Sequence, residues 1–112
     1  MLPLCEDTMQ MSEALMIMTG KGFGCLGVIN LEGDLIGVIT DGDLRRHMGT
    51  DLLDKTAADI MTKDPKTVVD TMLAAEALAM MNDNKIQSLF ICEESKPIGF
   101  IHLHDLLRAG VG

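Results

Sequence analysis

The feature that most constrains the fold of this chain is an internal repeat. The tripeptide Glu-Ala-Leu at 13–15 recurs at 76–78, an offset of 63 residues, and Ile-Gly at 36–37 recurs at 98–99, an offset of 62. The residue lost between these offsets falls in a predicted turn, where a structural repeat tolerates a deletion best. The 112 residues therefore hold two copies of one small unit. This length suits one compact domain or two very small units that share a core.

Each copy is predicted to form a helix, two strands and a short helix. In the first copy, Ser12 is a candidate N-cap, apolar residues follow at helical spacing, and Gly20 and Gly22 predict the end of that helix. The next elements predicted there are strands over 25–31 and 35–40, around a tight turn at 32–34, and a short helix over about 42–48. In the second copy the predictions are a helix from 70 or 71 to 81, strands over 88–92 and 98–101, and a helix over about 104–109. Because the strands are apolar on both faces, we expect helices to cover each small sheet, which is an α/β (α+β) arrangement.

The stretch between the two copies sets the predicted domain boundaries. Residues 59–65 (Asp-Ile-Met-Thr-Lys-Asp-Pro) have the character of a lead-in to the second copy, and Pro65 favours an extended chain before it. The predicted organisation is repeat 1 over 1–48, a linker over 49–58 and repeat 2 over 59–112. The matching lead-in of the first copy is only the short stretch 2–8, so we expect the chain to be a piece of a longer protein.

The composition indicates a folded, acidic protein. Hydrophobic residues make up 47% of the chain, which disfavours disorder. A net charge of −8 disfavours non-specific binding to nucleic acid or to anionic membranes, because both need clustered Lys and Arg. No uncharged apolar run approaches the roughly 18 residues of a membrane span, and the N-terminus lacks the features of a signal peptide. Cysteines are odd in number and not in metal-ligand spacing, so we expect a reducing, cytoplasmic location.

Two motifs point to a known family. The sequence Gly-Val-Ile-Thr-Asp-Gly-Asp at 37–43 places a glycine, apolar residues and a threonine before an aspartate three positions on. With the Ile-Met-Thr-x-x-Pro lead-in at 60–65, it resembles the ligand signature and linker of a tandem cystathionine-β-synthase (CBS) domain pair. The resemblance implies two CBS repeats, each a small sheet covered by helices, packed with pseudo-two-fold symmetry.

The resemblance extends to one enzyme family. Residues 22–25, 40–46 and 102–110 are similar to the C-terminal region of D-arabinose 5-phosphate isomerases. In that family, an N-terminal sugar-isomerase domain interconverts ribulose 5-phosphate and arabinose 5-phosphate, on the route to the sugar acid Kdo of lipopolysaccharide or capsule. None of that domain is present here. The resemblance therefore implies a regulatory or assembly module with no catalytic residues of its own.

The first copy holds the main candidate ligand-binding residues. Thr40 is the last residue of a predicted strand and Asp43 lies in the first turn of the next helix. A hydroxyl, main-chain N–H groups and a carboxylate are therefore expected to surround one potential binding site. A carboxylate suits the vicinal diol of a ribose, and Thr40 suits a phosphate. Asp41 adds negative charge that disfavours a polyphosphate. The alternative is that Asp41 or Asp43 only caps the helix. Arg46 either binds a sugar-acid carboxylate or makes an inter-subunit contact.

Further candidate ligand-binding residues come from both copies. Gly24 and Cys25 either let the backbone approach a ligand or simply end a helix and begin a strand. In the second copy, His102 replaces Thr40 and His104 replaces Gly42, which departs from the CBS signature and weakens the case for a phosphate site there. With Asp105 these histidines could form a metal site, but a structural role or a polar contact to a sugar is the preferred interpretation. We expect no metal and no required cofactor.

Two functions follow from this sequence. The first is a sensor that binds a nucleotide or nucleotide sugar, such as CMP-Kdo, and changes the activity of the attached isomerase domain; an AMP-like adenine nucleotide is the alternative ligand. CMP-Kdo carries a ribose, one phosphate and a carboxylate, which suit Asp43, Thr40 and Arg46. The second function is an oligomerisation module without a ligand, in which a homodimer buries an apolar helix face.

Overall fold

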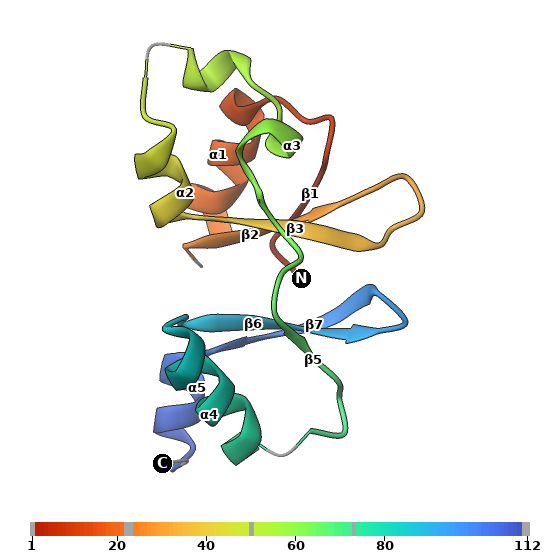
Figure 1. The fold of residues 1–112 in the computed structure, drawn as a ribbon, viewed down its shortest axis with the longest axis vertical. Coiled ribbons are helices and arrows are strands. Elements are labelled where there is room, and N and C mark those ends of the chain that lie inside the picture. The colour runs from red at the N-terminus through yellow and green to blue at the C-terminus, as the bar shows by residue number, and fades with distance from the viewer. Residues whose placement is uncertain (1, 22–23, 50, 73, 111–112) are drawn as a thin grey trace. The chain divides into compact units, whose positions relative to one another are not determined.

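The computed structural model describes residues 2–21, 24–49, 51–72 and 74–110. The chain divides into two compact units, of which the first spans Pro3–Pro65 and the second begins at Lys66. Each unit combines one small sheet with helices, which confirms the predicted mixed α/β class (Figure 1). The two units are described separately below.

The first unit is built on a four-stranded sheet. Its strands, in the spatial order β1-β2-β3-β4, are β1 (Leu4–Glu6), β2 (Cys25–Ile29), β3 (Leu35–Thr40) and β4 (Thr62–Lys63). β1 is parallel to β2, and the other neighbours are antiparallel. The strand predicted over 35–40 is confirmed to the residue. β1 and β4 are not predicted by the sequence, because two or three residues are too few to show a periodic pattern.

Helices cover one side of this sheet. They are α1 (Met11–Lys21), α2 (Asp41–Arg46), the 3-10 turn η1 (Leu52–Asp54) and α3 (Ala57–Ile60), and α1 and α2 lie on the same side of the strands (Figure 1). The core between the layers contains the fully buried side chains of Leu26 and Ile39. In the described part of the chain, no helix is both long and apolar enough to cross a membrane.

The start and end of α1 differ from the prediction. The helix begins at Met11, so Ser12 lies inside the first turn and is not the N-cap. The reason is tertiary: Met11 is fully buried, and its N–H donates to the carbonyl of Lys55 over 2.8 Å. Gly20 lies within the helix instead of ending it. Gly22 and Phe23, from the predicted helix end and the 22–25 motif, lie outside the described residues.

The middle of the chain packs into the first unit. The N–H groups of Ala57 and Ala58 donate to the carbonyls of Met9 and Asp7 over 2.8 and 3.0 Å, and β4 pairs with β3 through Thr62↔Val38 and Lys63↔Gly37. The lead-in assigned to repeat 2 by sequence similarity therefore completes the sheet of the first unit. The sequence repeat and the compact unit end at different residues, because this short segment is assigned by sequence to the second copy but pairs with the sheet of the first unit.

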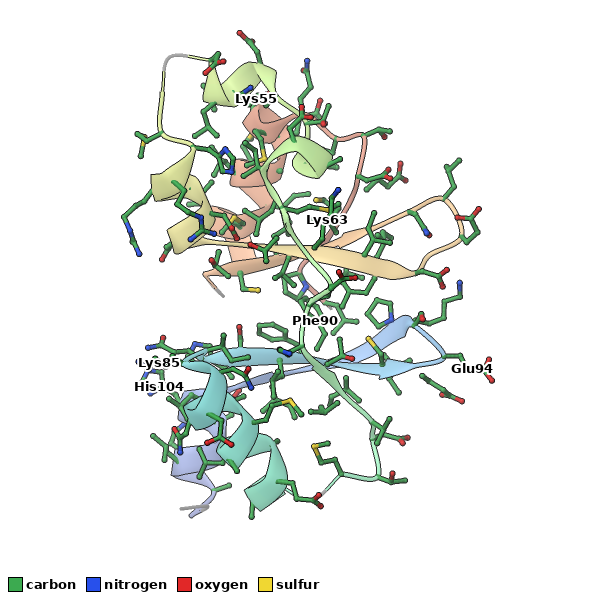
Figure 2. All side chains as sticks on the ribbon, in the orientation of Figure 1. Lys55, Lys63, Lys85, Phe90, Glu94 and His104 are labelled. Atoms are coloured by element: carbon green, nitrogen blue, oxygen red, sulfur yellow. The ribbon has the colours of Figure 1, made fainter. Side chains whose placement is uncertain are left out.

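The second unit has the same plan with three strands. Its elements are β5 (Thr67–Val68), α4 (Ala74–Asn84), β6 (Ser88–Glu93), β7 (Lys96–His102) and α5 (Leu103–Arg108), and its sheet order is β5-β6-β7. Leu89, Met81 and Leu106 lie in the core between the sheet and its helices. Phe90 extends from the other face of β6 (Figure 2) and packs on Phe100 with ring centroids 4.9 Å apart.

The start of α4 also differs from the prediction of residue 70 or 71. The chain first makes a turn, in which the N–H of Met72 donates to the carbonyl of Val69 over 3.1 Å. The helix described by the structure therefore begins only at Ala74 and continues to Asn84, three residues beyond the predicted Met81. The side-chain amide of Asn84 donates to the carbonyl of Met80 over 2.9 Å and so stabilises this last turn.

Cys5 on β1 gives a testable pH dependence. Burial and, to a smaller extent, the nearby carboxylates of Asp7 and Glu6 together raise the pKa of this thiol from 9.0 to about 11. The unfolded chain loses this proton first, so the contribution of Cys5 to stability is complete below about pH 9 and is lost as the pH rises towards 11. We expect the urea midpoint to fall over this range, and to fall less in Cys5→Ala. Equal losses in both proteins would contradict the assignment.

Candidate functional site

The predicted site residues of the first copy meet where β3 joins α2. β3 ends at Thr40 and α2 begins at Asp41, so the junction has no intervening loop. Thr40 is the register partner of Cys25 on the neighbouring strand. Gly24, which precedes Cys25, has a φ of +68°, a conformation that glycine adopts without strain. The structure thus brings Gly24 and Cys25 to the same end of the sheet as Thr40.

Thr40 and Asp43 form a capping box at this junction. Thr40 is the N-cap of α2, and Asp43 is the third residue of the helix. The Asp43 Oδ2 atom accepts from the Thr40 N–H over 2.9 Å and from the Thr40 hydroxyl over 3.2 Å. These bonds satisfy a main-chain donor that a helix start would otherwise leave without a partner. The capping role considered for Asp43 is therefore present in the structure.

Asp43 also has partners that capping does not require. Its Oδ1 atom accepts from the Thr62 hydroxyl over 2.5 Å and from the guanidinium of Arg46. Arg46 is the last residue of α2, and Thr62 comes from β4 on the neighbouring edge of the sheet. Among the charged residues that the structure describes, Asp43 alone is buried, at 2% exposure. A buried carboxylate needs such partners, because its charge has lost the stabilisation of water.

A second capping box in the same unit shows what is unusual about Asp43. Thr56 and Asp59 repeat the arrangement at the start of α3, with Oδ2 of Asp59 accepting from the Thr56 N–H and hydroxyl over 3.0 and 3.1 Å. These bonds lower the pKa of the Asp59 carboxyl. Asp59 is exposed, whereas Asp43 is buried and bound by two further side chains. Capping alone therefore does not account for the surroundings of Asp43.

The other predicted residues of this junction lie at its surface. Asp41 is exposed at the first position of α2, so it adds negative charge beside the capping box. The side chain of Arg46 is 63% exposed although it contacts a carboxylate that is only 3% exposed. The junction therefore has a buried acceptor and a largely hydrated cation directly next to it.

The second unit places its predicted residues in a different arrangement. His102 is the N-cap of α5, and its Nδ1 atom accepts from the N–H of His104 over 3.2 Å. The two imidazole rings stack with centroids 5.0 Å apart, and His104 lies at the end of the unit where α5 begins (Figure 2). Asp105 pairs with Arg108, as Asp43 pairs with Arg46, but the Asp105 side chain is 57% exposed. Among the residues that the structure describes, no three His, Cys, Asp or Glu side chains are grouped as metal ligands.

Two residues of the first site were not identified from the sequence. The hydroxyl of Thr62 donates directly to Asp43. Gly37 allows the segment of Thr62 to lie close to β3, because a Cβ atom on Gly37 would lie only 2.9 Å from the carbonyl oxygen of Thr62. A signal for both was present, since Gly37 opens the 37–43 motif and Thr62 belongs to the 60–65 lead-in. Each was interpreted within its own copy, so their contact was not predicted.

Comparison with known proteins supports the predicted resemblance. The arabinose 5-phosphate isomerase KdsD of Pseudomonas aeruginosa is 48% identical over 101 residues, which cover 88% of this chain and 31% of that protein. KdsD of Escherichia coli K12 is 37% identical over 112 residues, which cover 98% of this chain and 34% of that protein. This chain therefore spans about a third of the length of these relatives.

The fold is also that of known tandem CBS structures. The structure of CBSX2, a CBS-pair protein of Arabidopsis thaliana, in complex with AMP matches with a TM-score of 0.83 and 24% identity, covering 97% of this chain and 87% of that chain. The model of the CBS domain matches residues 2–50 and again 57–112. Because these two matches coincide with the two copies of the repeat, this chain belongs to the CBS domain family and holds a tandem pair of its domains.

Proposed function

We propose that this chain is the regulatory part of an arabinose 5-phosphate isomerase, and that the first unit binds a nucleotide or nucleotide sugar such as CMP-Kdo. The identity to two KdsD proteins over nearly the whole chain supports the link to that enzyme. The observation that carries the ligand site is the buried carboxylate of Asp43, which lies against Thr40 and Arg46.

The chemistry of these three side chains suits one class of ligand. A carboxylate accepts both hydroxyls of a ribose, and a hydroxyl and a guanidinium donate to a phosphate or carboxylate. The exposed Asp41 and the net charge of −8 disfavour a polyphosphate. The preferred ligand is therefore a nucleoside that carries a single phosphate, alone or linked to a sugar acid. End-product control of the isomerase by CMP-Kdo would follow from this chemistry.

Calorimetric titration of the chain with CMP-Kdo, CMP, AMP and ATP tests this proposal. We expect binding of CMP-Kdo or CMP, weaker binding of ATP, and at least about a tenfold loss of affinity in Asp43→Asn, because a hydrogen bond to a charged group is removed. Asp105→Asn is the matched control in the second unit and should leave the affinity unchanged. Circular dichroism of each variant separates lost binding from lost folding.

The attached isomerase provides the second part of the test. In the full-length enzyme, saturating CMP-Kdo should change the isomerase rate, and Asp43→Asn should abolish that response. If none of the four compounds binds and the rate does not respond, the sensor function is refuted.

The alternative function in that case is an oligomerisation module. It is supported by the exposed apolar side chains of Met16 and Leu107, at 74% and 52% exposure. Sedimentation analysis tests this alternative: the chain should sediment as a dimer, and Met16→Glu or Leu107→Glu should convert it to a monomer.

A further inference from the structure

The carboxylate of Asp43 has no acceptor position left for a ligand in this structure. A carboxylate offers about four acceptor positions, two on each oxygen. Oδ2 accepts from the N–H and the hydroxyl of Thr40, and Oδ1 accepts from the hydroxyl of Thr62 and the guanidinium of Arg46. The side chain is 3% exposed. A hydroxyl of a bound ribose therefore reaches Asp43 only by replacing one of these donors.

The four donors differ in how easily they leave the carboxylate. The N–H of Thr40 belongs to the main chain at the strand-to-helix junction and cannot rotate away. The Arg46 side chain is 63% exposed, so its guanidinium is already largely hydrated and can leave the carboxylate for water. On the other oxygen, the hydroxyl of Thr40 makes the longest of these contacts, at 3.2 Å, and turns about a single bond. Departure of these two donors frees one acceptor position on each oxygen, which matches the two hydroxyls of a vicinal diol.

The two groups that leave are close enough to act together. The position that a Cβ atom on Gly42 would take lies 3.5 Å from Nη1 of Arg46 and 3.6 Å from Oγ1 of Thr40. The guanidinium and the hydroxyl therefore face the same point, which Gly42 leaves without a side chain. Both groups are donors to phosphate and carboxylate oxygens. A single anionic group at this point satisfies both of them after they leave Asp43.

We propose that ligand binding at Asp43 is an exchange: a vicinal diol replaces Arg46 and the Thr40 hydroxyl on the carboxylate, and the anionic group of the same ligand accepts hydrogen bonds from both of them. This inference rests on the proposed function and narrows its ligand class to molecules that carry both a diol and an anion. Without ligand, Arg46 occupies an acceptor position of the carboxylate and so prevents a diol from binding there. An uncharged nucleoside has to break the Asp43–Arg46 ion pair without giving Arg46 a new partner, so it binds weakly.

The second unit supplies a matched control for this exchange. Arg108 pairs with Asp105 at the same spacing as Arg46 and Asp43, but both partners are exposed, at 78% and 57% of their side chains. Removal of Arg108 changes the same type of residue and the same net charge as removal of Arg46, without opening a buried carboxylate. Any effect seen with Arg46→Gln and not with Arg108→Gln therefore comes from the site at Asp43.

Paired titrations with CMP and cytidine, and with AMP and adenosine, test the exchange because each pair differs only in the phosphate. In the wild-type chain, we expect the nucleotide to bind at least about tenfold more tightly than the nucleoside. In Arg46→Gln, the nucleoside should bind more tightly than in the wild type, because the charged guanidinium that competes for the carboxylate is gone. The nucleotide should bind less tightly, so the preference is largely lost. Arg108→Gln should match the wild type. Arg46→Lys is the second variant if the glutamine variant does not fold, and its phosphate preference should also fall.

The outcomes separate this inference from the function on which it rests. If the wild type binds nucleotides but Arg46→Gln binds nucleosides no more tightly, Arg46 does not close the site and the exchange is overturned, while the ligand site remains. If the wild type binds nucleoside and nucleotide equally, the exchange is also overturned. If no compound binds to the wild type or to any variant, the proposed function itself fails. Nucleoside binding that appears only in Arg46→Gln supports the exchange directly.

Discussion

Replacement of Asp43 by alanine is expected to lower the free energy of unfolding of the first unit by about 2–3 kcal/mol. The substitution removes the acceptor of the Thr40 N–H, which is the helix-capping bond. It also leaves the Thr62 hydroxyl and the Arg46 guanidinium without their shared carboxylate. Arg46 is largely exposed and becomes hydrated in the variant, so the loss of its ion pair lowers the stability only a little. The Thr40 N–H and the cavity left at a buried position account for most of the effect.

Two alanine variants in the same chain serve as controls for Asp43→Ala. Asp59→Ala removes an exposed capping carboxylate and should lower the free energy of unfolding by less than Asp43→Ala does. Asp105→Ala removes an exposed ion-pair partner and should stay within about 0.5 kcal/mol. The chain has no Trp or Tyr, so urea unfolding is followed by far-UV circular dichroism, with hydrogen exchange to tell the units apart. A loss at Asp43 no larger than that at Asp59 would reduce Asp43 to an ordinary helix cap.

The sequence predicted those parts of the fold whose pattern is local and repeated. The strand over 35–40 and the helix after it follow from an apolar run that ends in Thr40 and from the recurrence of the same run in the second copy. β4 and β5 have two residues each, and no periodic pattern can be detected in so short a stretch. The start of α1 at Met11 depends on a bond to Lys55, which lies more than forty residues away in sequence, so the local N-cap signal of Ser12 was misleading.

The candidate site was predictable to the same extent. Thr40, Asp43 and Arg46 are close in sequence and lie on one strand-to-helix junction, so their spacing alone indicates that they meet. Thr62 follows Asp43 by nineteen residues and reaches it through the pairing of β4 with β3. The sequence similarity of 59–65 to a lead-in assigned this segment to the second copy. That assignment concealed the fact that its side chains contact the first.

Gly37→Ala is expected to have the second large effect, a loss of about 2 kcal/mol from the first unit through overpacking. A Cβ atom at this position would lie 2.5 Å from Sδ of Met61 and 2.9 Å from the carbonyl oxygen of Thr62. Met61 can adopt another rotamer, but the carbonyl moves only if β4 moves. Gly99→Ala is the matched control at the equivalent position of the second copy. Its new Cβ atom would meet Cδ1 of Ile91 at 3.0 Å, a side-chain atom that can shift, so this variant should lose less than about 1 kcal/mol.

A displacement of β4 by Gly37→Ala should also release Thr62 from Asp43, and this consequence has its own test. Thr62→Val removes the hydroxyl that donates to the carboxylate without changing the backbone. If the close approach at Gly37 positions Thr62, the double variant should lose less stability than the sum of the two single variants, because both remove the same hydrogen bond. Interaction energies between residues that share a partner are about 0.5 kcal/mol or more in such cycles. Strict additivity would mean that Gly37 serves only the packing of the sheet, and that Thr62 reaches Asp43 wherever β4 lies.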